Sequence, residues 1–107
     1  MSHNLQFYID GAWVDPVVPN NFDVIDPSTE DAFAQISLGT KPDVDKAVAA
    51  AKRAFNSFGF TSVEERLEIL NRVIEIYKKR SRDLALAVSR EMGAPRQMAL
   101  DSQVGVG

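Results

Sequence analysis

The sequence of 107 residues contains no cysteine, and this absence excludes two features at once. A thiolate nucleophile and a disulfide framework both need that side chain. Histidine is scarce as well, because His3 is the only one and lies near the amino terminus, where chains commonly fray. A serine mechanism needs an activating base, so we expect neither nucleophile and predict no catalytic residue in this chain.

The sequence also lacks an excess of positive charge and any long hydrophobic run. It has 12 Lys and Arg against 15 Asp and Glu and no dense basic block, so nucleic acid is not an expected partner. No apolar stretch approaches the roughly 20 residues that cross a bilayer, so we expect no membrane association. Residues 1–4 lack the basic start and apolar core of a secretory signal, and the cytoplasm is the expected location.

The first 40 residues predict extended structure. Asp10-Gly11 lies between the apolar residues 5–9 and 12–14, which is typical of a tight β-hairpin. Residues 22–25 and 32–38 predict a second hairpin, because Asp26-Pro27-Ser28-Thr29 between them is rich in turn formers. We therefore place two hairpins within residues 5–38.

From residue 41 onward the apolar residues follow helical spacing. Thr40 with Asp43 and Ser62 with Glu65 predict the starts of two helices, and Gly59 predicts a left-handed end of the first. The faces expected to be buried are Val44, Ala47, Val48, Ala51, Phe55 and Phe58 in the first helix, and Leu67, Leu70, Val73, Ile74 and Tyr77 in the second.

A third helix is expected to begin at Ser81 or Asp83, and a fourth apolar-spaced segment begins at Arg96. The predicted fold class is therefore α+β, with amino-terminal β-hairpins followed by three to four helices within residues 41–107. With 45% hydrophobic and 25% charged residues, the chain has the composition of one small globular domain.

Other candidate site residues have simpler interpretations. The carboxylates of the second helix alternate with basic residues, as on a solvated face: Glu64, Glu65, Glu68 and Glu75. Glu91 either turns inward beside Gly93 or, as is commoner for glutamate, is exposed. Phe7, Tyr8 and Trp13 have no flanking Lys or Arg, so we expect hairpin and core packing rather than a stacking platform for bases.

Several short motifs, taken in order, resemble the amino-terminal region of the NAD(P)-dependent aldehyde dehydrogenase superfamily. They are Phe7-Tyr8-Ile9-Asp10-Gly11-Ala12-Trp13-Val14, then Val24-Ile25-Asp26-Pro27-Ser28-Thr29-Glu30, the helix of residues 43–58, and Arg66, Leu70 and Ile76. Glu91-Met92-Gly93-Ala94-Pro95 is similar to the family's acidic, Gly, Lys, Pro turn, with Ala94 in place of the commoner lysine. The resemblance extends from Leu5 to the end.

This resemblance implies an enzyme that oxidises an aldehyde to a carboxylic acid. In the family a cysteine thiolate adds to the carbonyl, hydride passes to the nicotinamide, and a glutamate activates the water that hydrolyses the thioester. Residues 1–107 then form the amino-terminal part of the cofactor-binding domain of a homo-oligomeric enzyme. The nucleotide-binding sheet, the catalytic Cys and Glu and the oligomerisation arm come later, so NAD or NADP would bind only the full-length enzyme.

The resemblance also implies one partial site in this chain. Many family members hold a structural monovalent cation, Na+ or K+, with backbone carbonyls and an acidic side chain at the positions of Val24, Ile25 and Glu91. Oxygen ligands suit a hard cation. At least one further ligand would come from outside the chain.

Two interpretations account for the short length. The chain is either an inactive amino-terminal portion of an aldehyde dehydrogenase, or a natural short protein that serves as an assembly or binding module. A reading frame that continues past Gly107 would support the first interpretation. A genuine stop codon there would support the second interpretation. In the first case, the apolar helix faces would also contact the remainder of the enzyme, so the isolated chain is expected to self-associate. The aldehyde substrate and the choice between NAD and NADP are decided elsewhere.

Overall fold

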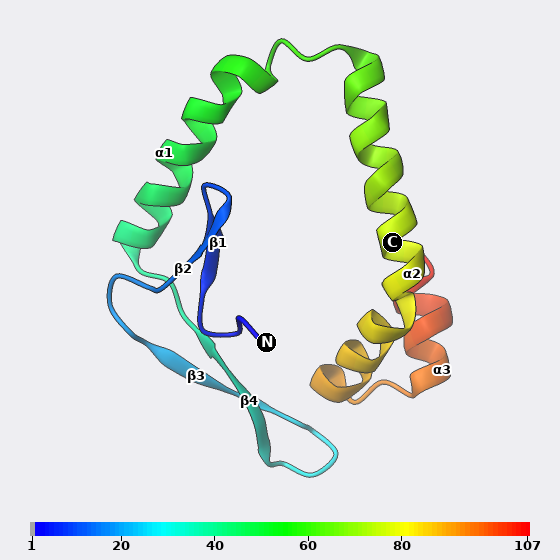
Figure 1. Ribbon diagram of the computed structural model, residues 1–107. Coiled ribbons are helices and arrows are strands. Elements are labelled where there is room, and N and C mark those ends of the chain that lie inside the picture. The colour runs from blue at the N-terminus through cyan, green and yellow to red at the C-terminus, as the bar shows by residue number, and fades with distance from the viewer. Residues whose placement is uncertain (1) are drawn as a thin grey trace. The chain divides into compact units, whose positions relative to one another are not determined.

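The computed structural model describes residues 2–107, and its elements form two compact units (Figure 1). The first unit comprises Met1–Val24 and Ala32–Thr61, and the second comprises Ile25–Asp31 and Ser62–Gly107. The short segment at the tip of the second hairpin thus packs with the later helices, although its neighbours in sequence belong to the first unit.

Both predicted hairpins are present. Strands β1 (Phe7–Ile9) and β2 (Ala12–Val14) pair antiparallel, with Tyr8 opposite Trp13. Between them Asp10 and Gly11 have φ values of 55° and 79°, as a two-residue type I′ turn requires. Strand β3 (Asn21–Ile25) pairs with β4 (Ala32–Ser37) in a second two-stranded sheet.

Helix α1 (Lys41–Phe58) begins at the predicted cap. The Asp43 Oδ2 atom accepts hydrogen bonds from the Thr40 backbone N–H at 2.9 Å and from the Thr40 hydroxyl at 3.0 Å. Its Oδ1 atom accepts from the Val17 N–H at 2.9 Å, so one buried carboxylate ties the connector before β3 to the start of the helix. These bonds lower the pKa of Asp43, with the bond from the Thr40 backbone contributing most.

The end of α1 is where the sequence predicts it, but its conformation is different. Gly59 has φ of −60° and a right-handed conformation, so the predicted left-handed cap is wrong. The Phe58 carbonyl accepts from the Thr61 N–H at 3.1 Å and from the Thr61 hydroxyl at 2.7 Å. A tight turn following the helix therefore satisfies this terminal carbonyl without a left-handed residue.

Helix α2 is a single helix from Val63 to Met92, so the predicted break at Ser81 or Asp83 is wrong. The Ser62 and Glu65 capping box is confirmed, with the Glu65 N–H donating to the Ser62 hydroxyl and the Ser62 N–H donating to the Glu65 carboxylate. No glycine or proline interrupts residues 63–92. The Ser81 hydroxyl donates to the Lys78 carbonyl within the helix instead of starting a new one.

The second unit has a small apolar core where the chain turns back after α2. The short helix α3 (Arg96–Met98) leads into the π-helical segment η1 (Ala99–Val104), which packs against α2. Ala85, Ala99 and Val104 are buried together, and the Tyr77 hydroxyl donates to the Val104 carbonyl at 2.9 Å. This bond closes the turn of chain against the helix.

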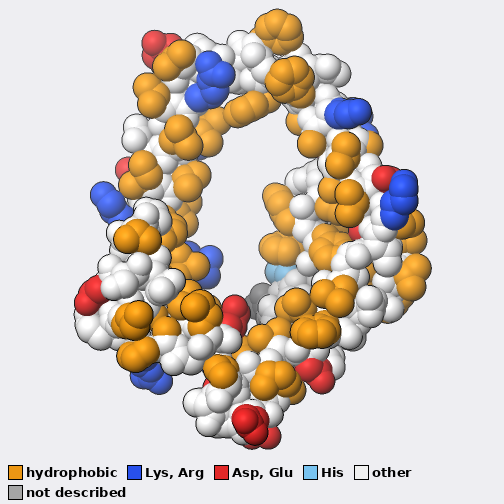
Figure 2. Space-filling view, turned by 180° about the vertical axis from the view of Figure 1, so that it is seen from behind, with side chains coloured by type: hydrophobic (Ala, Val, Ile, Leu, Met, Phe, Trp, Pro, Cys, Tyr) orange, Lys and Arg blue, Asp and Glu red, His pale blue; other side chains and the backbone are white. Residues whose placement is uncertain are grey.

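The two helix faces expected to be buried are mostly exposed, which corrects the prediction from spacing. In α1, Phe55 is 70% exposed, and in α2, Leu70 is 56% exposed. Figure 2 shows hydrophobic side chains over much of the visible surface. Among the described residues no large side chain is fully buried. No described helix combines the length and apolarity needed to span a membrane.

Candidate functional site

The turn between β3 and β4 is closed by its own backbone. The Asp26 N–H donates to the Asp31 carbonyl at 2.9 Å, and the Asp26 carbonyl accepts from the Glu30 N–H at 2.8 Å. Glu30 has φ of 62°, and the Asp31 N–H donates to the Thr29 hydroxyl oxygen at 3.4 Å. The turn therefore has a defined shape built from its own residues.

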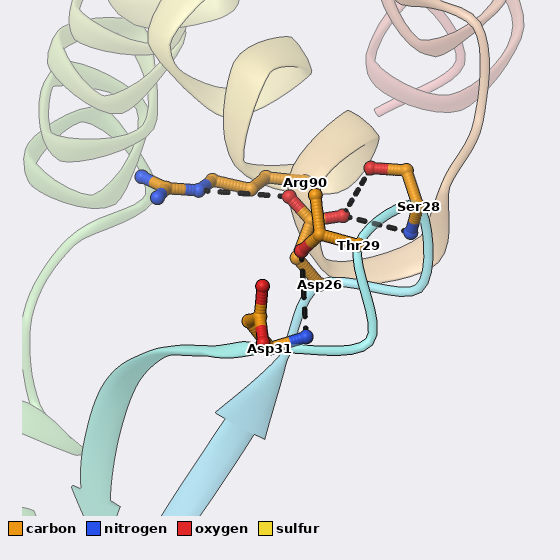
Figure 3. Close-up of polar contacts among 5 residues, drawn as sticks. All are labelled: Asp26, Ser28, Thr29, Asp31 and Arg90. Atoms are coloured by element: carbon orange, nitrogen blue, oxygen red, sulfur yellow. Dashed lines mark hydrogen bonds and ion pairs between the residues drawn. The ribbon is translucent and has the colours of Figure 1, made fainter.

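Asp26 has the largest number of side-chain contacts in this turn. Its Oδ1 atom accepts hydrogen bonds from the Ser28 hydroxyl and, at 2.9 Å, from the Ser28 N–H, while its Oδ2 atom lies 3.9 Å from Nε of Arg90 (Figure 3). The Ser28 hydroxyl contributes most to lowering the pKa of Asp26, followed by the Ser28 N–H, and the charge of Arg90 adds to them. Asp26 is thus held as a carboxylate.

A second contact connects the turn to the end of α2. Gly93 ends the helix in the left-handed conformation with φ of 73°, and its N–H donates to the Ser89 carbonyl at 2.9 Å. A Cβ atom added at Gly93 would lie 3.0 Å from Cγ of Pro27. The Gly93 backbone therefore approaches Pro27 more closely than a side chain comfortably allows. Beside this contact is a hollow of about 410 Å³, lined by Asp26, Ser28, Leu86, Ser89, Arg90 and Arg96.

The structure brings two of the three predicted cation ligands into the same unit. Ile25 directly precedes Asp26, and Glu91 directly follows Arg90. The ion pair between Asp26 and Arg90 therefore links the two segments of chain that contain Ile25 and Glu91. The Glu91 side chain is exposed, as the commoner alternative predicted. Val24 is half-buried and belongs to the first unit.

The chemistry of these donors fits a monovalent cation better than a divalent one. Backbone carbonyls with one carboxylate supply a single negative charge, whereas protein sites for divalent cations commonly gather several carboxylates. Within residues 2–107, no group of three or more His, Asp or Glu side chains is placed to hold a metal ion. The cation site at Val24, Ile25 and Glu91 stays a prediction.

The amino-terminal aromatic residues pack on the first hairpin. The His3 ring stacks on Trp13 with centroids 4.3 Å apart, and Tyr8 meets Trp13 edge-on at 5.2 Å. Packing within the hairpin is thus confirmed, but Tyr8 and Trp13 are exposed, so the expectation that they lie in a core is wrong. The Nδ1 atom of His3 hydrogen-bonds with Oε1 of Gln6 at 2.7 Å.

Sequence reasoning missed the roles of Asp26, Ser28 and Arg90. An Asp followed two residues later by Ser is a common turn motif, so the hydrogen bonds that Ser28 donates to the Asp26 carboxylate could have been anticipated. Arg90 lies far along the chain, and nothing in local sequence pairs it with Asp26.

Comparison with known proteins shows that the sequence of this chain matches a protein family. The model of the family described as aldehyde dehydrogenase matches residues 13–106. A 3-succinoylsemialdehyde-pyridine dehydrogenase from a Pseudomonas species is 45% identical over 103 residues, which cover 95% of this chain and 22% of that protein. The chain thus spans about one fifth of the length of this relative.

Solved structures give the same result for the fold. The aldehyde dehydrogenase of Bartonella henselae is 53% identical and superposes with a TM-score of 0.92 over 94% of this chain and 21% of that one. A variant of aldehyde dehydrogenase C from Pseudomonas syringae, in complex with NAD+ and octanal, is 40% identical with a TM-score of 0.95 over 97% of this chain and 21% of that one. The predicted fold, two hairpins followed by helices, is therefore confirmed.

Proposed function

Because this chain belongs to the aldehyde dehydrogenase family, we propose that it is the amino-terminal segment of an enzyme that oxidises aldehydes to carboxylic acids with NAD+ or NADP+. The observation that carries this proposal is the family match across residues 13–106 in a chain without cysteine. The thiolate that attacks the aldehyde must come from elsewhere in the enzyme. In this proposal the segment is structural and contains neither the nucleophile nor the cofactor site.

The exposed apolar helix faces support a role in packing. Along α2 four apolar residues at helical spacing are about half exposed: Leu67 52%, Leu70 56%, Val73 55% and Ile74 48%. Side chains at these spacings share one face of a helix, and monomeric soluble proteins rarely expose such a continuous apolar surface. We therefore infer that the remainder of the enzyme covers this face, and that copies of the isolated chain cover it for one another.

Light scattering during size-exclusion chromatography tests this packing role. The 107-residue chain is expected to elute as a dimer or larger, and replacing Leu70 and Ile74 with Glu is expected to shift it toward monomer. Glu68→Gln, which alters an exposed polar position of the same helix, is the matched control and should leave the mass unchanged. A clean monomer of the unmodified chain at micromolar concentration would refute the packing role.

We further propose that the full-length enzyme holds Na+ or K+ through the carbonyls of Val24 and Ile25 and the carboxylate of Glu91, completed by a ligand from outside this chain. The cation would tie the β3 and β4 turn to the end of α2 by charge and coordination. The test is the dependence of the enzyme's thermal midpoint on NaCl or KCl, with choline chloride at equal ionic strength as the reference. Glu91→Ala should reduce this dependence, whereas Glu75→Ala, at another exposed position of α2, should preserve it.

A further inference from the structure

The tip of the second hairpin is packed as part of the helical unit. Residues Ile25–Asp31 group with Ser62–Gly107. Two consecutive residues of this turn contact the end of α2: Asp26 pairs with Arg90, and Pro27 lies close to Gly93.

The two oxygens of the Asp26 carboxylate have different partners. One oxygen closes the turn through Ser28, and the other faces Arg90. The Asp26 side chain is only 18% exposed, whereas that of Arg90 is 55% exposed. A fixed, largely covered carboxylate loses little conformational entropy when it pairs, so even a long ion pair can orient the turn.

We propose that Asp26 and Arg90 are positioning residues that hold the β3 and β4 turn against the carboxyl end of α2. Neither residue acts on a substrate. Ser28 fixes the orientation of the Asp26 carboxylate, and Arg90 attracts that carboxylate toward α2. The close approach of Pro27 to Gly93 limits how near the turn can come to the end of the helix.

This pairing has a consequence for the proposed cation site, and that consequence alone rests on the proposed function. Ile25 and Glu91 flank the paired residues, so fixing Asp26 to Arg90 also limits how far the Ile25 carbonyl can move from Glu91. Arg90 also balances the negative charge of the Asp26 carboxylate, so Glu91 is left as the anionic ligand for a monovalent ion. Positioning of the turn itself requires no cation, cofactor or aldehyde.

Amide hydrogen exchange measured by NMR on the 107-residue chain tests the proposal. The Asp26 and Glu30 amides report closure of the turn, because both donate within it, and amides inside α2 serve as the internal reference. Asp26→Asn keeps an oxygen that can accept from Ser28 but removes the charge that faces Arg90. Arg90→Gln removes the other charge, and Arg90→Lys restores it.

Asp26→Asn and Arg90→Gln are each expected to speed exchange of these two turn amides about three- to fivefold relative to α2, and the double variant should add little to either single change. Arg90→Lys should stay within about twofold of the unmodified chain. Lys41→Gln removes a more exposed ion pair, with Asp45 in the other unit, and should leave the turn unchanged.

Three results would overturn the proposal: unchanged exchange in Arg90→Gln, additive effects in the double variant, or equal acceleration in Lys41→Gln. These measurements need no aldehyde, cofactor or cation, so failure of the positioning role can be distinguished from failure of the proposed enzyme function.

Discussion

The two units of the chain are stabilised by different chemistry. In the first unit the buried residues include Ser37 and Asp43, whose side chains make hydrogen bonds to backbone groups distant in sequence. In the second unit the buried residues are apolar and gather as Ala85, Ala99 and Val104. The buried groups of the first unit thus include polar side chains that make directional hydrogen bonds, whereas those of the second unit are small apolar side chains that pack together.

This difference shows how a chain with little buried surface can still hold a defined arrangement. Hydrogen bonds donated to a buried carboxylate fix a connector without a large core, and leaving their donors unpaired is costly. A small apolar cluster is sensitive to volume instead. The two units should therefore respond to different changes, and four experiments test this difference.

The largest effect is expected from Asp43→Ala. Removing the carboxylate leaves the Val17 N–H and the Thr40 N–H and hydroxyl without their acceptor. Hydrogen exchange of the Val17 amide should rise on the order of tenfold to a hundredfold, with exchange in η1 unchanged. Asp45→Ala, at an exposed position of the same helix, is the control and should have little effect. Equal acceleration in both units would contradict the contrast.

Ala99→Leu is expected to act on the second unit alone. Ala99 is 0% exposed, so three additional carbon atoms must displace neighbours, at about 1–3 kcal/mol of unfolding free energy. Denaturant titration monitored by amide signals of α2 measures the loss. Ala87→Leu on the exposed side of α2 should cost less than about 0.5 kcal/mol. If both variants behave alike, the cluster around Ala99 is not a core.

Gly93→Ala should destabilise the end of α2 by about 1 kcal/mol, because the backbone is left-handed there and the added carbon approaches Pro27. Thermal unfolding followed by circular dichroism gives the change. At Gly39 the nearest atom to an added carbon is in the Phe7 ring at 3.5 Å, an ordinary contact, so Gly39→Ala is the control. A Gly93→Ala chain as stable as the control would show that the turn does not pack on the helix end.

Acidification should produce the smallest effect, and it should act on the bonds of Asp43 in the first unit before it reaches the apolar cluster at η1. The folded pKa of Asp43 is below its usual value of 3.8, so its carboxylate contributes stability above that value and loses it as pH falls through the folded pKa. Amide spectra recorded from about pH 5 downward should show Val17 and Thr40 shifting before residues of η1. The opposite order would contradict the different roles of polar and apolar groups.

Much of the fold could be predicted from local sequence. The Asp10-Gly11 turn and the caps at Thr40 and Ser62 depend on neighbouring residues, and all three are confirmed. The break near Ser81 was wrong, because a possible cap does not end a helix that has no glycine or proline there. Local signals therefore identified starts better than interruptions.

The errors about buried faces and missed long-range pairs concern partners that are distant in the sequence or outside the chain. An apolar stripe such as the one containing Phe55 indicates that a face packs against something, but spacing cannot say whether the same chain supplies it. Likewise, the hydrogen bond from the Val17 N–H to Asp43 and the ion pair between Asp26 and Arg90 join segments whose proximity depends on tertiary structure. The positions at Val24, Ile25 and Glu91 came from family resemblance and remain predictions.

The most direct test of the central claim is an assay of the purified chain, with its mass verified, for aldehyde-dependent reduction of NAD+ and NADP+. If these 107 residues provide structure and not chemistry, no reduction should exceed the rate without protein. Saturable turnover by the chain alone, at any aldehyde concentration, would contradict the account.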